Sequence, residues 1–409
     1  MKKIAVIGSM DTKGMEYLYL IGKLKEYGAE TISIDISTYG KPAFTPDITS
    51  DRIAMAGGRD FLHEENCELT KSEKLSVMAA GAVKTVCELQ ETGDIDGIIG
   101  MGGGQGTFMI SEVMRALPIG FPKFLISTIL NLPGATHRAF RDLGDTVLMN
   151  SVVDVSGDNA IILSVMDKAA GAIVGMANSE SEKHFEAAPG RKKIGISMWG
   201  VTTPCVSRIR SQLEAQGYEV YAFHANGIAG AIIEKLVKQG FFDGMIEITL
   251  SEFVQDRVGV YNRPIPNRLD GPSVSAIPYI LAPGGVDMVQ MVRPFDNLPE
   301  RYQDRQYFYH NENAMFVRST GEECNYIGEE ISKKLNAGIT PVKVFLPLQG
   351  LSDADKEGGP LRNPENDEKL FEAIRKNFTN GEIVEVDAHL NSTEFADRIA
   401  DAMNKILTK

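Results

Sequence analysis

A glycine-rich turn at residues 100–107 has the residue types that most clearly suggest chemistry. Five of its eight residues are glycine, and it follows an apolar run and precedes a stretch typical of a helix. Without side chains, a backbone can approach an anion closely and direct N–H groups toward it, while the following helix adds the positive end of its dipole. The turn matches neither G-x-x-x-x-G-K-[ST] nor G-x-G-x-x-G. The sequence predicts a phosphate-binding turn, with a ligand-free strand-to-helix turn as the alternative.

A second anion-prone turn, Asp-Thr-Lys-Gly at residues 11–14, follows the first apolar run of the chain. Lys13 would present its ammonium near a helix N-terminus, where a phosphate could be held, and Thr12 and Gly14 would add donors. The alternative is a helix cap beside a solvent-facing lysine. Ser127 and Thr128 end a further predicted strand, and they either supply hydroxyls to the same ligand or cap the segment that follows.

Polar residues also gather at predicted strand ends in the second half of the chain. Glu247, Asp287 and His310 are candidate acid–base or metal-binding groups, and His224 and His389 lie in similar positions. No H-E-x-x-H or comparable spacing links them. Each histidine alone is therefore equally compatible with a hydrogen-bonded structural role, and the sequence leaves the metal question open.

Composition limits the classes of function. A chain of 409 residues with 43% hydrophobic and 24% charged residues is typical of a globular protein of two or three domains. Its net charge of −13 argues against nucleic-acid binding. The four cysteines are scattered, which fits a reducing compartment. No segment is expected to reach the length needed to cross a bilayer, so we expect a cytoplasmic protein without membrane contact.

The elements that would position these residues form two similar series. Lys-Lys-Ile at residues 2–4 recurs at residues 192–194, and three further strand-like segments match in the same order. Nearly continuous apolar strands alternating with helices predict doubly wound, mainly parallel α/β sheets, related here by internal duplication. Ligands of such sheets bind beyond the carboxyl ends of the strands, where both anion-prone turns would lie. A polar segment at residues 178–191 predicts the linker between domains at 1–185 and 191–409.

Several strings together resemble a known family. They include Gly8 to Gly14, the glycine turn, Ser-Val-Val-Asp at residues 151–154, Val-Thr-Thr-Pro-Cys at residues 201–205 and Pro-Gly-Gly-Val-Asp at residues 283–287. Over its whole length the chain resembles a bacterial member of the uncharacterised family named after the ATP-binding N-terminal region of the tomato tobamovirus-resistance protein. The resemblance implies two Rossmann-like domains, ATP bound by the first domain, and self-association into a homo-oligomer.

The resemblance also implies nucleotide contacts at Asp11, Thr12, Lys13 and the turn from Gly102 to Thr107, to which the residue patterns described above add Gly14, Ser127 and Thr128. The expected cofactor-binding residues are Asp11, Thr12, Lys13, Gly14, Gly102, Gly103, Gly104, Gln105, Gly106, Thr107, Ser127 and Thr128. The turn is similar to the Gly-Gly-Asp-Gly-Thr loop of phosphofructokinase-like and NAD-kinase-like enzymes, but Gln105 stands where their aspartate would be. Since a neutral amide is a poor magnesium ligand, we expect this turn to hold phosphate through its backbone and not to place a metal.

Three hypotheses follow for the function. The first is an enzyme that uses ATP with Mg²⁺ on a small carboxylate or carbonyl metabolite in an interdomain cleft, with Lys13, Glu247, Asp287 and His310 as catalytic groups. The second is a nucleotide-responsive binding or regulatory protein without turnover. The third is a dinucleotide-dependent oxidoreductase, for which Asp35 at the end of the second strand would be the ribose-binding acid.

Overall fold

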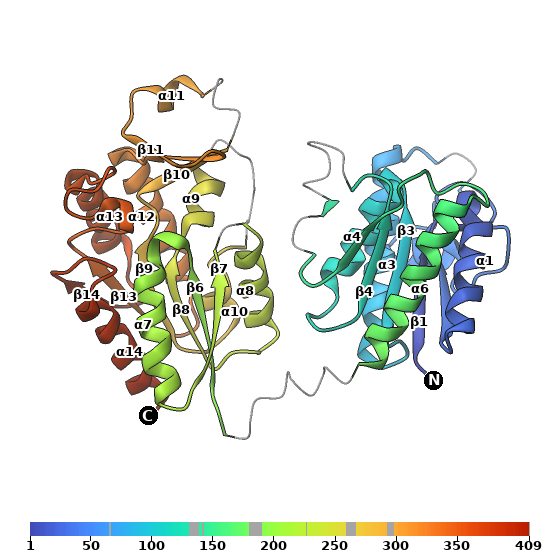
Figure 1. The fold of residues 1–409 in the computed structure, drawn as a ribbon, viewed down its shortest axis with the longest axis horizontal. Helices are drawn as coiled ribbons and strands as arrows, with labels where there is room; N and C mark the ends of the chain where they lie inside the picture. Colours follow the sequence, from blue (N-terminus) through green and yellow to red (C-terminus); the bar gives the residue numbers. More distant parts are fainter. Residues whose placement is uncertain are drawn as a thin grey trace. The chain divides into compact units, whose positions relative to one another are not determined.

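The chain folds into two units, each with its own parallel sheet. The computed structural model describes residues 1–64, 67–130, 139–140, 143–179, 190–225, 227–258, 267–292 and 298–408. Its contacts divide the chain into Met1–Glu186 and Ala187–Lys409. In each unit, helices cover a twisted sheet of mainly parallel strands (Figure 1). Most of the predicted linker, residues 180–189, lies outside the described residues.

The first unit alternates strands and helices from its first residues. Its elements are β1 (Lys3–Gly8), α1 (Met10–Glu26), β2 (Glu30–Asp35), α2 (Ser50–Ala56), α3 (Lys71–Glu91), β3 (Gly97–Gly102), α4 (Gly104–Ala116), β4 (Lys123–Ser127), β5 (Val147–Asn150) and α6 (Ala160–Asn178). The five strands are parallel in the order β2-β1-β3-β4-β5. One buried cluster joins α1 and α6 to the sheet, and a second joins α2, α3 and α4 to its other face.

The register of this sheet brings the expected phosphate contacts to one edge. Gly8 at the end of β1 pairs with Asp35 at the end of β2, and Gly102 at the end of β3 pairs with Ser127 at the end of β4. The helices α1 and α4 begin directly after β1 and β3. Two helix N-termini therefore meet at the carboxyl edge of two neighbouring strands, as the apolar runs followed by short turns predict.

The second unit is larger and carries a second, smaller sheet. Its elements are β6 (Lys193–Met198), η2 (Gly200–Thr202), α7 (Thr203–Ala215), β7 (Glu219–His224), α8 (Ile228–Lys238), β8 (Gly244–Thr249), α9 (Ser251–Arg257), α10 (Gly271–Val274), β9 (Tyr279–Gly284), β10 (Met288–Val292), α11 (Glu300–Gln303), β11 (Tyr307–Asn311), β12 (Ala314–Arg318), α12 (Gly321–Asn336), β13 (Val342–Pro347), η3 (Asp353–Asp355), α13 (Pro364–Asn377), β14 (Gly381–Val386) and α14 (Thr393–Leu407).

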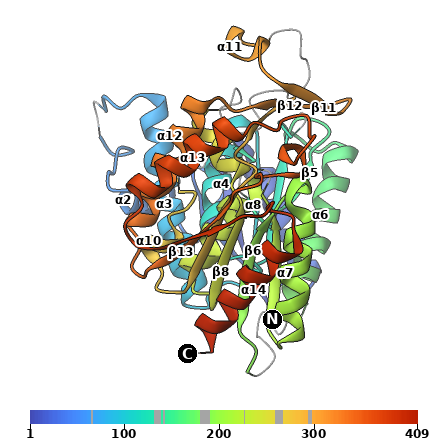
Figure 2. The same ribbon diagram turned by 90° about the vertical axis from the view of Figure 1, so that its left-hand side faces the viewer.

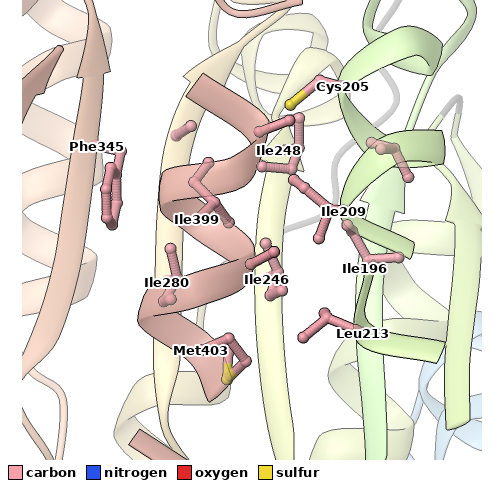
Figure 3. Packing of buried hydrophobic residues seen from close by; sticks show 14 of the residues in the cluster. Ile196, Cys205, Ile209, Leu213, Ile246, Ile248, Ile280, Phe345, Ile399 and Met403 are labelled. Atoms are coloured by element: carbon pink, nitrogen blue, oxygen red, sulfur yellow. The ribbon is translucent and has the colours of Figure 1, made fainter. Parts of the chain in front are cut away.

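Six parallel strands in the order β14-β13-β9-β8-β6-β7 form the main sheet of this unit. Its core lies between the strands and helices α7 and α14, where Ile209 and Ile399 face Ile246 (Figure 3). Residues of β8 and β9 are buried along the whole length of both strands. Such strands must be covered on both faces, which explains why they appear in the sequence as continuous apolar runs.

A three-stranded antiparallel sheet, β10-β12-β11, lies across one end of the main sheet (Figures 1 and 2). Phe316 of β12 packs edge to face against Trp199, which follows β6, with the ring centroids 5.1 Å apart. Met288 and Leu361 belong to the same buried cluster. The sequence prediction of mainly parallel sheets holds, and this small sheet was not anticipated because its strands are short and flanked by irregular segments.

The strand orders of the two units match over four strands. β2-β1-β3-β4 in the first unit and β7-β6-β8-β9 in the second unit have the same sequence of crossovers and the same parallel directions. The predicted α/β class with two Rossmann-like doubly wound units is confirmed. The shared order is what an internal duplication would leave behind.

One expectation about apolar segments was wrong. Helix α6 has 19 residues and is apolar enough, by length and composition, to cross a bilayer. Eight of its residues, among them Ile162, Ala169 and Ile173, are buried, and they belong to the cluster that α6 shares with α1 and the sheet. A core helix of a doubly wound unit passes the same test of length and composition, because it is apolar on the face that packs against the sheet.

Candidate anion site at the glycine turn

A cavity of about 380 Å³ opens at the carboxyl edge of β1 and β3. It is lined by Ser9, Thr12, Lys13, Met101, Gly102, Gly103, Gly104, Gln105 and Gly106. The lining therefore combines the two turns that the sequence singled out with Ser9, which the sequence analysis did not select. The signal for Ser9 was present, since serine between a strand and a helix is a typical N-cap and places its hydroxyl at this edge.

The glycines of the turn serve two different purposes. A Cβ on Gly100 would lie 2.7 Å from Ile110 of α4, and a Cβ on Gly102 would lie 2.8 Å from the backbone nitrogen of Thr107. These two glycines are required by the close packing of β3 and α4. A Cβ on Gly104 would have no heavy atom within 4 Å, and on Gly103 or Gly106 the nearest atom would lie 3.7 or 3.9 Å away.

Internal packing therefore does not explain Gly103, Gly104 and Gly106. Gly103 has an extended backbone with φ −79°, and Gly104 and Gly106 lie in the first turn of α4, so a left-handed conformation does not explain them either. Glycine within a helix costs about 1 kcal/mol relative to alanine. The side that these residues leave bare faces the cavity, and the first-turn N–H groups of α4 have no partner within the helix. This is the arrangement of an anion cradle.

Lys13 is the one charged side chain among the described residues that line the cavity. Its side chain is 19% exposed, and its ammonium donates a hydrogen bond of 2.6 Å to the carbonyl oxygen of Val155. The carboxylate of Asp154 lies 3.9 Å from the same nitrogen and is largely exposed. Lys13 is therefore the one side chain of the described lining that could pair with an anion, and in this structure its ammonium is bonded to the Val155 carbonyl oxygen.

Tyr17 fixes the relative positions of the two turns. Its buried hydroxyl lies 2.9 Å from the carbonyl oxygen of Ile7 and accepts a hydrogen bond of 3.0 Å from the N–H of Met101. Burial raises the pKa of this phenol above its ordinary value. A Cβ on Gly8 would lie 1.6 Å from the Tyr17 oxygen, so Gly8 makes room for it. Helix α1 and strand β3 are thereby held together at the edge that carries Lys13 and the glycine turn.

Other expected contacts are engaged within the protein. The hydroxyls of Thr107 and Ser127 are buried and lie 2.8 Å apart, and Thr107 also donates to the carbonyl oxygen of Gly102. The N–H of Thr128 donates to the same carbonyl oxygen at 3.1 Å. These three residues link the carboxyl ends of the neighbouring strands β3 and β4. Of the three, Thr128 is half-buried and keeps its hydroxyl near the cradle, 3.7 Å from a Cβ placed on Gly103.

Asp11 and Gly14 face the loop after β2. Asp11 accepts a hydrogen bond of 3.0 Å from the N–H of Gly40, and a Cβ on Gly14 would lie 2.7 Å from that of Ala43. Asp35 is fully buried and accepts from the N–H groups of Met10 and Ser37. Burial raises the pKa of Asp35. These contacts anchor the start of α1 and do not line the cavity.

The three candidate catalytic groups of the second unit lie in three different environments. Glu247 is in the middle of a buried network in which Arg268 donates two hydrogen bonds to its carboxylate, at 2.7 and 2.6 Å. Arg268 is fully buried and also pairs with Glu234 and Glu252. Burial raises the pKa of Glu234 to about 7. One buried guanidinium therefore contacts three carboxyl groups, and burial raises the pKa of two of them, Glu234 and Glu252.

Asp287 is buried, whereas His310 is exposed on the small antiparallel sheet. Asp287 is buried and accepts a hydrogen bond of 2.7 Å from the hydroxyl of Ser352, and burial raises its pKa to about 7. His310 lies on β11, exposed, with its ring 5.3 Å from that of Phe316. The ring of His389 is 2.9 Å from the carbonyl oxygen of Ser352 and accepts from the N–H of Asn391. Among the described residues, no three His, Cys, Asp or Glu side chains form a metal-binding group.

Comparison with known proteins gives a family and a set of distant folds. The model for the N-terminal domain of an uncharacterised protein family, UPF0261, matches residues 2–182, and the model for the C-terminal domain of that family matches residues 191–407. A UPF0261 protein of Clostridium tetani is 34% identical over 413 residues, covering 100% of both chains. The ToMV resistance protein Tm-1(GCR237) of Solanum lycopersicum is 35% identical over 321 residues, covering 77% of this chain and 42% of the tomato protein.

Solved structures resemble the chain only remotely. MurG of Acinetobacter baumannii is 11% identical with a TM-score of 0.23, over 99% of this chain and 100% of MurG. A UDP-GlcNAc 2-epimerase from Neisseria meningitidis is 13% identical with a TM-score of 0.25, over 100% of both chains.

Proposed function

The chain belongs to the UPF0261 family, and from this premise we propose that it binds ATP, with the triphosphate in the cavity at the glycine turn. The observation that carries the proposal is the bare backbone of Gly103, Gly104 and Gly106. Neither packing nor left-handed geometry requires glycine there, and all three line the cavity. A close approach by a ligand is the remaining physical reason for three glycines.

The electrostatics of the cavity support an anionic ligand. Lys13 is the one charged lining residue in the described part of the chain, and α1 and α4 both begin at the cavity. The helices have 17 and 13 residues, long enough for their dipoles to add to the lysine charge. The choice of ATP among phosphate-bearing ligands rests on the family resemblance of the residues described above.

None of the described side chains that line the cavity is a carboxylate, so the protein offers no strong ligand for Mg²⁺ there. The described lining residues contribute a neutral amide, hydroxyls and backbone groups, and Gln105 stands where a metal-placing loop would carry aspartate. Mg²⁺ prefers oxygen ligands that include at least one carboxylate or several phosphate oxygens. We therefore assign the phosphate contacts to the backbone of the turn and to Lys13, and no metal contact to the described lining residues.

The dinucleotide alternative is less well supported. In dinucleotide-binding units, the acid at the end of the second strand meets the ribose hydroxyls. Here Asp35 is fully buried and accepts hydrogen bonds from the start of α1 and from Ser37. Turnover of a small carboxylate or carbonyl substrate stays a prediction, and with it the catalytic roles of Glu247, Asp287 and His310. A regulatory role without turnover stays a prediction in the same way.

Isothermal titration calorimetry tests the proposed function. The wild-type chain should bind ATP, and Lys13→Met should lower the affinity by about 10- to 100-fold, because a charge-assisted hydrogen bond contributes about 1.5–3 kcal/mol. Lys23→Met is the matched control, since it removes the same charge from the other end of α1, where Lys23 pairs with Glu26. Absence of ATP binding by the wild-type chain would contradict the proposal, as would equal affinities for the two variants.

A further inference from the structure

Val152 adopts a conformation that a valine rarely tolerates. Its φ is +67°, in the left-handed region, and the residue is 70% exposed, so packing does not compensate for the strain. A left-handed conformation costs a residue with a Cβ about 1–2 kcal/mol. Strain of this kind persists only where surrounding contacts impose it, and it concentrates at functional sites.

Short-range hydrogen bonds hold the turn around Val152. The N–H of Val152 donates to the side-chain oxygen of Asn150 at 2.7 Å. The hydroxyl of Ser151 donates to the carbonyl oxygen of Val153 at 2.6 Å, and the N–H of Val153 donates to the carbonyl oxygen of Ser151 at 2.8 Å. The segment follows β5, whose last residue, Asn150, pairs with Ser127 at the same sheet edge as the glycine turn.

The strained turn leads directly to Lys13. The carbonyl oxygen of Val155, just beyond the turn, accepts the hydrogen bond of 2.6 Å from the Lys13 ammonium. Val155 itself is buried in the cluster that joins α1 and α6 to the sheet, so its carbonyl group is held in place. Lys13 also departs from helical geometry, with φ −130° and ψ 26° inside the first turn of α1. Lys13, the one cationic residue in the described lining of the cavity, is thus hydrogen-bonded to a carbonyl group that follows a strained turn.

We propose that the segment from Ser151 to Val155 is the ligand-responsive part of the cavity: an entering phosphate draws the Lys13 ammonium away from the Val155 carbonyl, and Val152 then leaves its left-handed conformation. The inference rests on the proposed function, since it needs an anion in the cavity. Val152 and Val155 are positioning residues, because they act on the ligand through Lys13. Val152 is strained in the arrangement in which Lys13 is bonded to Val155. Release of this strain favours the ligand-bound arrangement and so increases the affinity for the ligand.

Two substitutions at one position test this inference. Glycine adopts the left-handed conformation without strain, whereas alanine removes the valine methyl groups and keeps the strain of a Cβ. Val152→Gly should therefore stabilise the arrangement with Lys13 on Val155 and weaken ATP binding by about 5- to 30-fold relative to Val152→Ala, the fold-change that corresponds to the strain of one left-handed residue. Calorimetric titration with ATP measures both dissociation constants, and thermal melting checks that both variants fold.

Val152→Gly and Val152→Ala, each combined with Lys13→Met, show whether the difference in ATP affinity depends on Lys13. With the ammonium absent, the glycine and alanine variants should bind ATP with dissociation constants within about twofold of each other, because the coupling has lost one of its partners. Equal affinities of Val152→Gly and Val152→Ala in the chain that keeps Lys13 would overturn the inference while leaving the proposed function intact. If the wild-type chain does not bind ATP at all, the proposed function itself fails.

Discussion

The two parallel sheets share the order of four strands, but the connections at their carboxyl edges differ. One connection leaves its backbone bare, and the other is filled with buried side chains. In the first unit, the connection after β3 is the glycine turn, with bare backbone facing a cavity. In the second unit, the connection after β8 is made of buried side chains: the hydroxyl of Thr249 lies 2.7 Å from that of Thr202, and Ser251 donates to the carbonyl oxygen of Ala225.

The difference shows that polar residues at a strand end do not by themselves indicate a binding site. At β8 the polar groups satisfy one another, and the carboxylates of Glu234, Glu247 and Glu252 are paired with Arg268. At β3 three glycines line the cavity without a packing reason, and the first-turn N–H groups of α4 have no partner within the helix. A missing side chain with no packing reason is therefore the more specific signal of the two.

The largest expected effect would come from Arg268→Met. The substitution leaves three buried carboxylates without their guanidinium, and loss of one partner from a buried ion pair costs about 3–5 kcal/mol of unfolding free energy. Trp199, the single tryptophan of the chain, is buried in the second unit, so urea unfolding followed by its fluorescence reports on that unit. ATP affinity should not change.

Arg208→Met is the matched control, since Arg208 pairs with Asp397 on the exposed surface of the same unit. Its unfolding midpoint should stay close to that of the wild-type chain. If Arg268→Met instead left the stability of the second unit unchanged and altered ATP affinity, the two edges would not differ in the way described.

Gln105→Asp should have a smaller effect, confined to the first unit. A carboxylate in the cavity would repel phosphate and lower ATP affinity by about tenfold at low ionic strength, with or without Mg²⁺. Gln105→Asn, which keeps a neutral amide, should bind like the wild-type chain. Titrations in EDTA and in excess Mg²⁺ measure both variants. Tighter binding of ATP by Gln105→Asp in Mg²⁺ alone would mean that this turn can place a metal.

Much of this contrast could be predicted from the sequence, and some of it could not. The α/β class, the doubly wound order and the glycine turn follow from apolar runs and their connections. The sequence could not show that Thr107 and Ser127 bond to each other, because a hydroxyl at a strand end points equally well to a ligand or to a neighbouring strand. Glu247 carried a readable signal, since a carboxylate between Ile246 and Ile248 must find a buried partner.

Contacts between residues far apart in the chain could not be predicted from the sequence pattern. Lys13 meets Val155 across 142 positions of the chain, and Arg268 meets Glu234 across 34 positions. The left-handed conformation of Val152 is equally invisible in the sequence, since valine is an unfavourable residue there. These features depend on how the elements pack, which periodicity does not encode.

A still smaller effect should appear in the pH dependence of the second unit. Asp367 of α13 is buried and accepts a hydrogen bond from Arg318. Burial raises the pKa of Asp287 to about 7 and that of Asp367 to about 8, so the folded chain holds these protons more tightly than the unfolded chain does. The stability from this proton binding is fully present below the unfolded pKa, near pH ~4, and is lost as the pH rises through about 7 to 8. The urea midpoint reported by Trp199 should therefore fall over this range.

Asp287→Asn is the variant that sharpens this expectation. An amide mimics the protonated carboxyl and does not titrate, so the variant should show a flatter pH profile than the wild-type chain. A urea midpoint of the wild-type chain that rises between about pH 6 and pH 8 would contradict the assignment of raised pKa values to this region.

The most direct test of the account is the substitution Gly104→Ala, measured by thermal melting and by ATP titration. Alanine in the first turn of α4 should raise the stability by up to about 1 kcal/mol, while its Cβ, which enters open space at the cavity, should weaken ATP binding by roughly tenfold or more. Gly22→Ala, at an exposed position of α1 with nothing within 4 Å, should raise stability without changing affinity. Unchanged ATP affinity in Gly104→Ala would contradict the claim that the glycine turn is bare because a ligand lies against it.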